Sequence, residues 1–585
     1  MRSDENWLVR RTAADSDRLG ETESVFALSN GWVGWRGTLD EGEPYGMPGS
    51  YLNGFHEQRE LSYPEDGYAF PQRSDTVVSA PNAALIRLWV GGDALDLRTG
   101  TLRAHERVLD LRAGVIRRDT EWISPGGHGV RVRSTRLVSL PRHPIAAVRY
   151  EVEPLGDAPV ELRLCSDVQA NERVPENPDD PRAASVIRDP LNAEAHRCDG
   201  GSGVLVHRTD RSAQRVAVAV THESEIPEGF ATSDDCTADR LRMCVEGRLR
   251  PGQRLRITKY AAHECTPVDG MAANELADLV VAEADAAREY GFDALLADQR
   301  AALDGHWQTA DVELDGDPEL QQAIRFAVFH LLQAGRAEGD RTIPAKGLTG
   351  NGYDGHVLWD NEGYVLPVLT YLAPEVTRSA LRWRHAHLPE ARERAAELRL
   401  PGATFPWRTI SGRECSGYWP AGTAALHVNA DIADAVLRYV AATGDDDLLA
   451  EAALHDLADL GDKTSDGLHL AALAGAWTAV VEGFGGLRDQ RGELSFDPRL
   501  PARLDRLAFG LRWRGQRLRV TLTRDEARYE LPDADPEVEV TLRHAGELVT
   551  VTGGTAVTRL MPPVPDPGPE PPSPAGRRPA RRSAG

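Results

Sequence analysis

Alternation of apolar and polar residues marks the chain from about residue 20 to residue 265 as β-structure. Val148, Tyr150 and Val152 alternate with charged residues, and the same period of two recurs over 130–133 and 160–164. Clusters of Gly, Pro, Asp and Asn separate such runs. Many short strands with polar outward faces predict a large antiparallel β-sandwich over residues 1–265.

The pattern changes near residue 266, where alanine- and leucine-rich segments predict helices. Two of them, over 274–290 and 293–307, form a predicted linker over residues 266–310. Asp317 and Pro318 then supply an N-cap acid and a proline at the first helical position, which indicates another helix start. Further helices are expected over 362–371, 374–387, 389–398, 428–443, 448–460 and 468–484. We therefore expect a helical domain over residues 311–486.

Strand-like alternation returns after Gly486. Val520 and Val540 each lie at the centre of an apolar-polar alternation, so a small C-terminal β domain is predicted over residues 487–560. The last segment, 561–585, is rich in proline and poor in apolar residues, and we expect a disordered tail there. The fold class expected for the whole chain is multidomain α+β.

Charge and composition narrow the classes of partner. The formal net charge of −23 disfavours binding to nucleic acids and to anionic membrane surfaces, and it favours neutral small molecules. The chain has no apolar h-region at its N-terminus and no long apolar run, so a cytoplasmic location is expected. The six cysteines show no CxxC spacing and no neighbouring histidine cluster. We expect neither a metal site nor a disulfide framework in so large and cysteine-poor a chain.

Two segments hold the residue types that sugar sites use. One is 347–362, which contains Trp359 and Asp360, and the other combines 405–408 with 418–427. Sugar CH faces stack on aromatic rings, and their hydroxyls bind carboxylates, so an adjacent Trp and Asp suit a glycoside. The alternative is ordinary packing, with the tryptophan in a core and the carboxylate capping a helix. Glycosidic cleavage would also need a carboxylic acid that protonates the leaving oxygen.

Several longer motifs give the chain a resemblance to a known family. The order of the predicted domains and these motifs is similar to glycoside hydrolase family 65, the trehalose, kojibiose and maltose phosphorylases. The motifs lie at Phe26–Gly37, Tyr51–Glu57, Gly347–Glu362, Leu388–Arg392, Gly402–Trp407, His427–Ala433 and Asp466–Trp477.

The resemblance implies a fold, a reaction and a set of site residues. It implies a galactose-mutarotase-like sandwich and a six-hairpin (α/α)6 barrel. The implied reaction is inverting phosphorolysis of an α-linked disaccharide to β-glucose 1-phosphate, with phosphate as co-substrate, no cofactor, and a possible homodimer. Trp359 and Asp360 would bind the glucosyl unit, and His469 would lie at the phosphate pocket, although His469 could also be a packed histidine at a helix start. Glu362 would not be the proton donor and would orient its neighbours or cap its helix.

The part of the family pattern that carries the general acid is absent. The family's acid resembles a Glu in Gly-Pro-Asp-Glu-Tyr, which this chain lacks, as it lacks a Lys-Gln pair and a His-x-Ser-Ser motif. No catalytic residue can therefore be identified. Segments that resemble early and late parts of the barrel meet at about 447–451, so the barrel is expected to be truncated there. The missing part is on the order of 150–200 residues, judged from the length of a helix with its loop.

Three interpretations of this gap stay open. The chain could be an α-glucoside phosphorylase, impaired by loss of the acid, or a hydrolase on the same fold. It could be a non-catalytic carbohydrate-binding remnant. It could also be the product of a damaged gene, because a barrel without one arc exposes apolar helix flanks.

Overall fold

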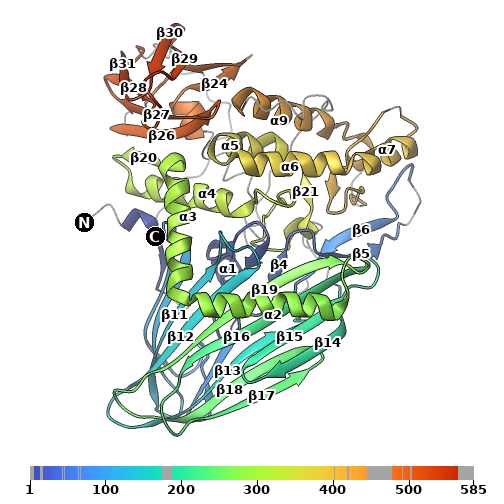
Figure 1. The fold of residues 1–585 in the computed structure, drawn as a ribbon, viewed down its shortest axis with the longest axis vertical. Coiled ribbons are helices and arrows are strands. Elements are labelled where there is room, and N and C mark those ends of the chain that lie inside the picture. Colours follow the sequence, from blue (N-terminus) through green and yellow to red (C-terminus); the bar gives the residue numbers. More distant parts are fainter. Residues whose placement is uncertain are drawn as a thin grey trace, which may run out of the picture.

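The computed structural model describes residues 5–12, 18–42, 44, 46–63, 65, 67–173, 187–400, 402–417, 421–443, 477, 479–490, 492–500 and 504–563. Figure 1 shows a β-rich part that holds the first half of the chain, helices stacked on one end of it, and a small sheet domain beside those helices. This order agrees with the α+β organisation expected from the sequence. The predicted helix over 448–460, most of that over 468–484, the expected break at 447–451 and the tail from 564 onward lie outside the described residues.

Two large antiparallel sheets build the β-rich domain. The nine-stranded sheet has the order β1 (Leu8–Arg11), β9 (Thr101–Asp110), β10 (Val115–Ile123), β11 (Gly129–Val138), β12 (Ile145–Leu155), β19 (Leu255–Pro267), β16 (Gln214–Glu225), β15 (Ser202–Arg208), β14 (Asn192–Asp199). The five-stranded sheet has the order β17 (Ala231–Thr237), β18 (Arg240–Leu249), β13 (Val160–Gln169), β7 (Ile86–Val90), β8 (Asp93–Ala94). Val148, Val152 and Leu164, which the alternation pattern turned inward, are fully buried in the core that the two sheets share.

One disulfide in this domain contradicts the expectation from cysteine spacing. Cys165 on β13 and Cys244 on β18 are bonded across neighbouring strands. They are separated by 79 positions, so only the strand register brings them together. The expectation was based on short cysteine spacings and on the overall cysteine content, and neither contains information on which strands pair.

The helices agree closely with the segments that the sequence indicated. The linker is formed by α2 (Ala273–Tyr290), which packs on the nine-stranded sheet, and α3 (Phe292–Ala310). The helical domain contains α4 (Pro318–Ala334), α5 (Leu366–Leu372), α6 (Pro374–Ala386), α7 (Leu388–Glu397), α8 (Ala421–Ala424) and α9 (Val428–Thr443). The predicted cap is present at α4, where the side chain of Asp317 accepts a hydrogen bond from the backbone N–H of Leu320 at 3.0 Å.

The C-terminal domain consists of two small sheets. One has the order β20 (Val312–Asp315), β26 (Arg506–Trp513), β27 (Gln516–Thr523), β28 (Glu526–Glu530), β31 (Ala556–Leu560), and the other has β24 (Leu487–Gln490), β25 (Glu493–Phe496), β29 (Glu539–His544), β30 (Glu547–Thr552). Strand β20 follows α3 directly in sequence, and Val312 pairs with Phe509. The start of the segment that the sequence assigned to the helical domain is therefore part of the C-terminal sheet.

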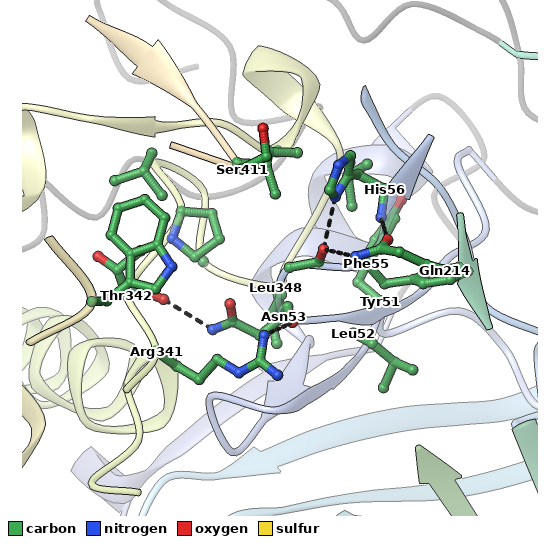
Figure 2. Close-up of a pocket in the computed structure, with 18 of the residues that line it drawn as sticks. Tyr51, Leu52, Asn53, Phe55, His56, Gln214, Arg341, Thr342, Leu348 and Ser411 are labelled. Carbon is green, nitrogen blue, oxygen red and sulfur yellow. Dashed lines mark hydrogen bonds between the residues drawn. The ribbon is translucent and has the colours of Figure 1, made fainter. Parts of the chain in front are cut away.

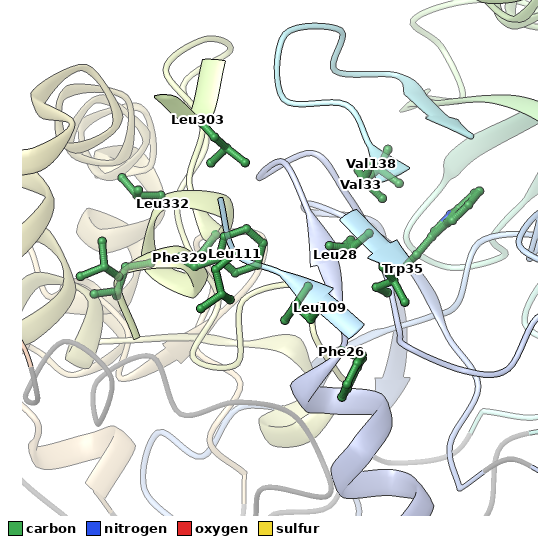
Figure 3. Packing of buried hydrophobic residues seen from close by; sticks show 14 of the residues in the cluster. Phe26, Leu28, Val33, Trp35, Leu109, Leu111, Val138, Leu303, Phe329 and Leu332 are labelled. Carbon is green, nitrogen blue, oxygen red and sulfur yellow. The ribbon is translucent and has the colours of Figure 1, made fainter. Parts of the chain in front are cut away.

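A continuous apolar core joins the β-rich domain to the helices. Figure 3 shows Phe26, Leu28 and Trp35 from the N-terminal motif on one side of Leu109 and Leu111, and Leu303 of α3 and Phe329 of α4 on the other side. All of these residues belong to one buried cluster. Two large domains that share such a core are held in a fixed relative position. The N-terminal motif is therefore the part of the β-rich domain that supports the helical domain.

Gly31 shows how closely the two backbones approach at this junction. Its φ is +76°, and a Cβ added there would lie 2.4 Å from the carbonyl carbon of Gly335, just after α4. Nearby, Arg36 donates from Nη1 to the carbonyl oxygen of Thr349 at 2.6 Å. The motif over Phe26–Gly37 thus positions the segment 347–362, which carries the candidate sugar-binding residues.

Candidate functional site

A short β pairing brings together the two segments that the sequence marked as sugar-like. Strand β21 (Val357–Leu358) pairs antiparallel with β22 (Arg408–Thr409), and Leu358 lies opposite Arg408. Trp359 and Trp407 are the residues next to this pair in sequence. The pairing therefore brings the two segments together, although they are about fifty positions apart in the chain.

Trp359 lies in a small aromatic cluster at the start of the helical wall. Its side chain is 5% exposed and packs with Ala425, Val428, Ile432, Phe405 and Trp407. The ring of His427 meets it edge-on at 5.8 Å between centroids, and the ring of Tyr364 lies at 5.7 Å. The packing interpretation thus describes the Trp359 ring well, since most of its surface is already covered by protein.

Asp360 differs from Trp359 in its exposure. It is half-buried and precedes the π-helical turn at Asn361–Val365, which leads directly into α5. Tyr364, in the same turn, is 39% exposed. A carboxylate at this place lies at the edge of the aromatic cluster, where it can accept hydrogen bonds from the hydroxyls of a sugar.

Glu362 is committed to a buried ion pair. Arg384 on α6 donates from Nε to Oε1 at 2.9 Å and from Nη2 to Oε2 at 3.0 Å, and Asn361 donates to Oε1 at 3.2 Å. The side chains of both Glu362 and Arg384 are essentially inaccessible to solvent. A carboxylate held by both oxygens in this way has no free oxygen to carry a proton to a substrate.

His356 is fixed in one tautomer beneath the β21–β22 pair. Burial, together with the charge of Arg408, lowers the pKa of His356 to about 4, so the ring is neutral. The guanidinium of Arg408 donates from Nε to Nδ1 of His356 at 3.0 Å. Nε2 therefore carries the proton, and it donates to the carbonyl oxygen of Asp75 at 2.6 Å. His356 thus anchors the sugar-like segments to the β-rich domain.

Glu414 organises the second segment, a role that the sequence did not indicate. Its carboxylate accepts hydrogen bonds from the backbone N–H groups of Trp407 at 2.7 Å and Ser416 at 2.9 Å, and from the Ser416 hydroxyl at 2.6 Å. Like Glu362, it is occupied by donors of its own loop. The only signal for it in the sequence is an acid within a short irregular segment, which is too common to identify such a role.

A cavity of about 340 Å³ lies between the two domains near this site. Figure 2 shows Asn53 and His56 on one wall, with Arg341 and Thr342 from the helical domain beside them. Asn53 spans the junction, because its side-chain amide donates to the carbonyl oxygen of Thr342 at 2.9 Å and to that of Gly31 at 2.9 Å. Trp359 and Asp360 do not line this cavity.

His469, the residue predicted at the phosphate pocket, lies outside the described residues. Among the residues that the structure describes, no group of three or more His, Cys, Asp or Glu side chains could hold a metal ion. No helix in the described ranges is both long enough and apolar enough to cross a membrane.

Comparison with family models gives three matches in chain order. Residues 9–306 match the N-terminal domain of glycosyl hydrolase family 65, residues 325–455 match its central catalytic domain, and residues 487–551 match its C-terminal domain.

Similar proteins include uncharacterized and named relatives. An uncharacterized glycosyl hydrolase of Mycobacterium tuberculosis is 37% identical over 781 aligned positions, which cover 99% of this chain and 98% of that protein. An alpha,alpha-trehalose phosphorylase of Thermoanaerobacter brockii is 35% identical over 452 positions, 76% of this chain but only 58% of that enzyme. A solved structure titled as a putative kojibiose phosphorylase from the human microbiome has the same fold, with a TM-score of 0.84 at 17% identity, covering 95% of this chain and 99% of the other.

The length of the mycobacterial alignment reveals a gap. Because the alignment has 781 positions and this chain has 585 residues, at least 196 aligned positions of that relative have no residue here. The alignment reaches both ends of the chain, so nearly all of these positions are internal. The sequence indicated a missing part of about 150–200 residues, and its position near 447–451 stays a prediction.

Proposed function

The chain belongs to glycosyl hydrolase family 65, and on that basis we propose that it is a protein of the α-glucoside phosphorylase type whose glucosyl-binding wall persists while its phosphorolytic chemistry is impaired. The observation that carries this proposal is the β21–β22 pairing, which brings the segment that contains Trp359 and Asp360 against the segment that contains Phe405 and Trp407. The proposed ligands are a trehalose-, kojibiose- or maltose-like disaccharide and inorganic phosphate. A named relative, the trehalose phosphorylase of T. brockii, supports this choice.

Phosphorolysis with inversion sets a short list of requirements. Phosphate is itself the nucleophile, so the protein must supply an acid for the leaving oxygen, a pocket for the anion and groups that hold the sugar. Asp360 and the edge of the Trp359 cluster meet the last requirement. His469 is the residue proposed for the anion pocket.

The acid is the requirement that this site does not meet. Glu362, at the end of the first sugar-like segment, and Glu414, between the two parts of the second, are buried and have their carboxylate oxygens held by protein donors. Neither can take the place of the Glu in the missing Gly-Pro-Asp-Glu-Tyr motif. We infer that this motif falls within the positions for which the mycobacterial relative has residues and this chain has none. General-acid catalysis is worth roughly 10²–10⁴-fold in rate, so its loss alone would reduce turnover by that amount.

Binding without turnover is therefore the behaviour that we expect. Isothermal titration of the purified protein with trehalose, kojibiose, nigerose and maltose should give saturable binding of at least one of them. Asp360→Asn should weaken that binding about tenfold or more, because charge-assisted hydrogen bonds to the sugar are lost. Asp278→Asn is the matched control, since Asp278 is exposed on α2, which packs on the nine-stranded sheet, and pairs with Arg197 on β14.

Two results would overturn the binding part of the proposal. Failure of all four disaccharides to bind would show that no glucosyl-binding wall persists. Equal loss of binding in Asp360→Asn and Asp278→Asn would show that the effect does not come from the site. The expected homodimer and cytoplasmic location stay predictions.

A further inference from the structure

Five of the six cysteines lie on strands of the β-rich domain, and two of them lie where edge strands of the two large sheets approach each other. Cys165 and Cys244 already form a disulfide within the five-stranded sheet. Cys198 lies on β14, the last strand of the nine-stranded sheet, and Cys236 lies on β17, the last strand of the five-stranded sheet. Both of these residues are free thiols, half-buried against the shared core.

The packing of β14 against β17 brings the two free thiols near each other. Cys198 pairs with Gly203 on β15, and Cys236 pairs with Leu241 on β18. A Cβ added at Gly203 would lie 3.1 Å from Cδ1 of Leu241 and 3.3 Å from Cβ of Cys198. The two strand pairs are therefore in direct contact, and the thiols of Cys198 and Cys236 are near enough to influence each other's ionisation.

A second contact holds the same two edges together. The backbone N–H of Gly201, in the turn between β14 and β15, donates to Oδ2 of Asp234 on β17 at 3.1 Å. Burial first, and the neighbouring thiol of Cys198 second, raise the pKa of Cys236 to about 12. The Cys236 thiol is therefore protonated near neutral pH and reacts slowly with a disulfide, so the pair needs an excess of oxidant to react.

We propose that Cys198 and Cys236 form a thiol-oxidation site, at which a small-molecule disulfide such as oxidised glutathione converts them into a second disulfide of the domain. One cysteine, as thiolate, attacks the oxidant and releases one glutathione thiolate, giving a mixed disulfide. The other cysteine then displaces the second glutathione. The protein loses two electrons and two protons, and the oxidant is reduced to two thiols.

The bond would join two sheet edges that lack a strand neighbour on one side. Unpaired edges are where a sheet frays or pairs with another chain. A crosslink across residues 199–235 also restricts the unfolded chain, which raises the temperature of unfolding. The oxidised protein should therefore be the more heat-stable form, with its thermal midpoint raised by a few degrees.

Peptide mapping of the full-length protein under non-reducing conditions tests the proposal directly. After incubation with oxidised glutathione, we expect a peptide crosslinked through Cys198 and Cys236, and a fall from four to two in the thiols titrated after denaturation. Cys198→Ser should abolish the crosslink and the rise in thermal midpoint. Cys265→Ser is the matched control, because Cys265 is also a half-buried free thiol but is not the partner of the pair.

Two results would contradict the formation of a Cys198–Cys236 disulfide. The proposal is wrong if the oxidised wild-type protein shows glutathione attached to single cysteines without the Cys198–Cys236 crosslink. It is also wrong if the thermal midpoint rises equally in wild type and in Cys198→Ser. Because mapping of the wild type needs no variant, poor folding of a serine variant would not hide either result.

Discussion

Arg384 grips both carboxylate oxygens of Glu362, at 2.9 and 3.0 Å, and neither side chain is accessible to solvent. The carboxylate two residues after Asp360 is therefore a structural group that fixes the start of α5 against α6. The two acids of the Trp-Asp-Asn-Glu sequence therefore differ in their surroundings. Asp360 is half-buried, whereas Glu362 is buried in an ion pair with Arg384.

Removing Arg384 should destabilise the helical domain strongly. Arg384→Met leaves Glu362 buried without its cation, a change that costs about 3–5 kcal/mol in proteins. Arg382→Met is the control on the same helix, since its pair with Asp340 is half-exposed on both sides and should cost less than about 1 kcal/mol. Urea unfolding followed by circular dichroism measures the difference. Equal stability of the two variants would contradict a structural role for the buried pair.

A methyl group at Gly31 should disturb the junction between the domains. Gly31→Ala places a Cβ 2.4 Å from the backbone of Gly335, and Gly92→Ala adds the same atom at positive φ with nothing within 4 Å. The shared backbone strain cancels between the two, so Gly31→Ala should be less stable by about 1–3 kcal/mol, the usual range for overpacking. Thermal unfolding of both variants gives the comparison. A Gly31→Ala protein as stable as Gly92→Ala would mean that the domains do not pack as described.

Lys259 should make stability depend on pH above neutrality. Its ammonium is fully buried and donates to the carbonyl oxygens of Ala83, Leu85 and Asp167, and burial lowers its pKa from 10.5 to about 7. Between pH 7 and pH 10.5 the unfolded chain then binds more protons at Lys259 than the folded protein does. Stability from this group must rise with pH across that window and level off at either end.

A comparison with Lys259→Met isolates that contribution. The free energy of unfolding of the wild type, minus that of Lys259→Met, should increase from pH 7 to pH 10. Other titrating groups are common to both proteins and cancel in this difference. A difference that falls or stays flat with pH would show that the pKa of Lys259 is not lowered in the folded protein.

Local sequence patterns predicted most of the helices and strands correctly. They did not predict contacts between residues far apart in the chain. The alternation around Val148 and Val152, and the cap at Asp317, depend on neighbours within a few positions, so the sequence shows them. The Leu358–Arg408 pairing depends on a loop closure of about fifty residues, for which no local period exists.

Some features of the candidate site are visible in the sequence, and others are visible only in the structure. The adjacency of Trp359 and Asp360 is visible in the sequence, as is the exclusion of Glu362 as the acid by resemblance. That Trp359 is almost covered, and that Glu414 is held by its own loop, follow only from packing and hydrogen bonds. The pair Cys165–Cys244 is hidden for a similar reason, because a strand register specifies it and a spacing does not.

Whether this protein catalyses phosphorolysis is tested most directly by an assay for β-glucose 1-phosphate. The purified full-length protein is incubated with phosphate and, separately, with trehalose, kojibiose, nigerose or maltose, and β-glucose 1-phosphate is measured. We predict no phosphate-dependent release from any of the four sugars, or release at a rate at least about 10²-fold below that of an intact family member assayed in parallel. Release of β-glucose 1-phosphate at a rate equal to that of the intact enzyme would contradict the account.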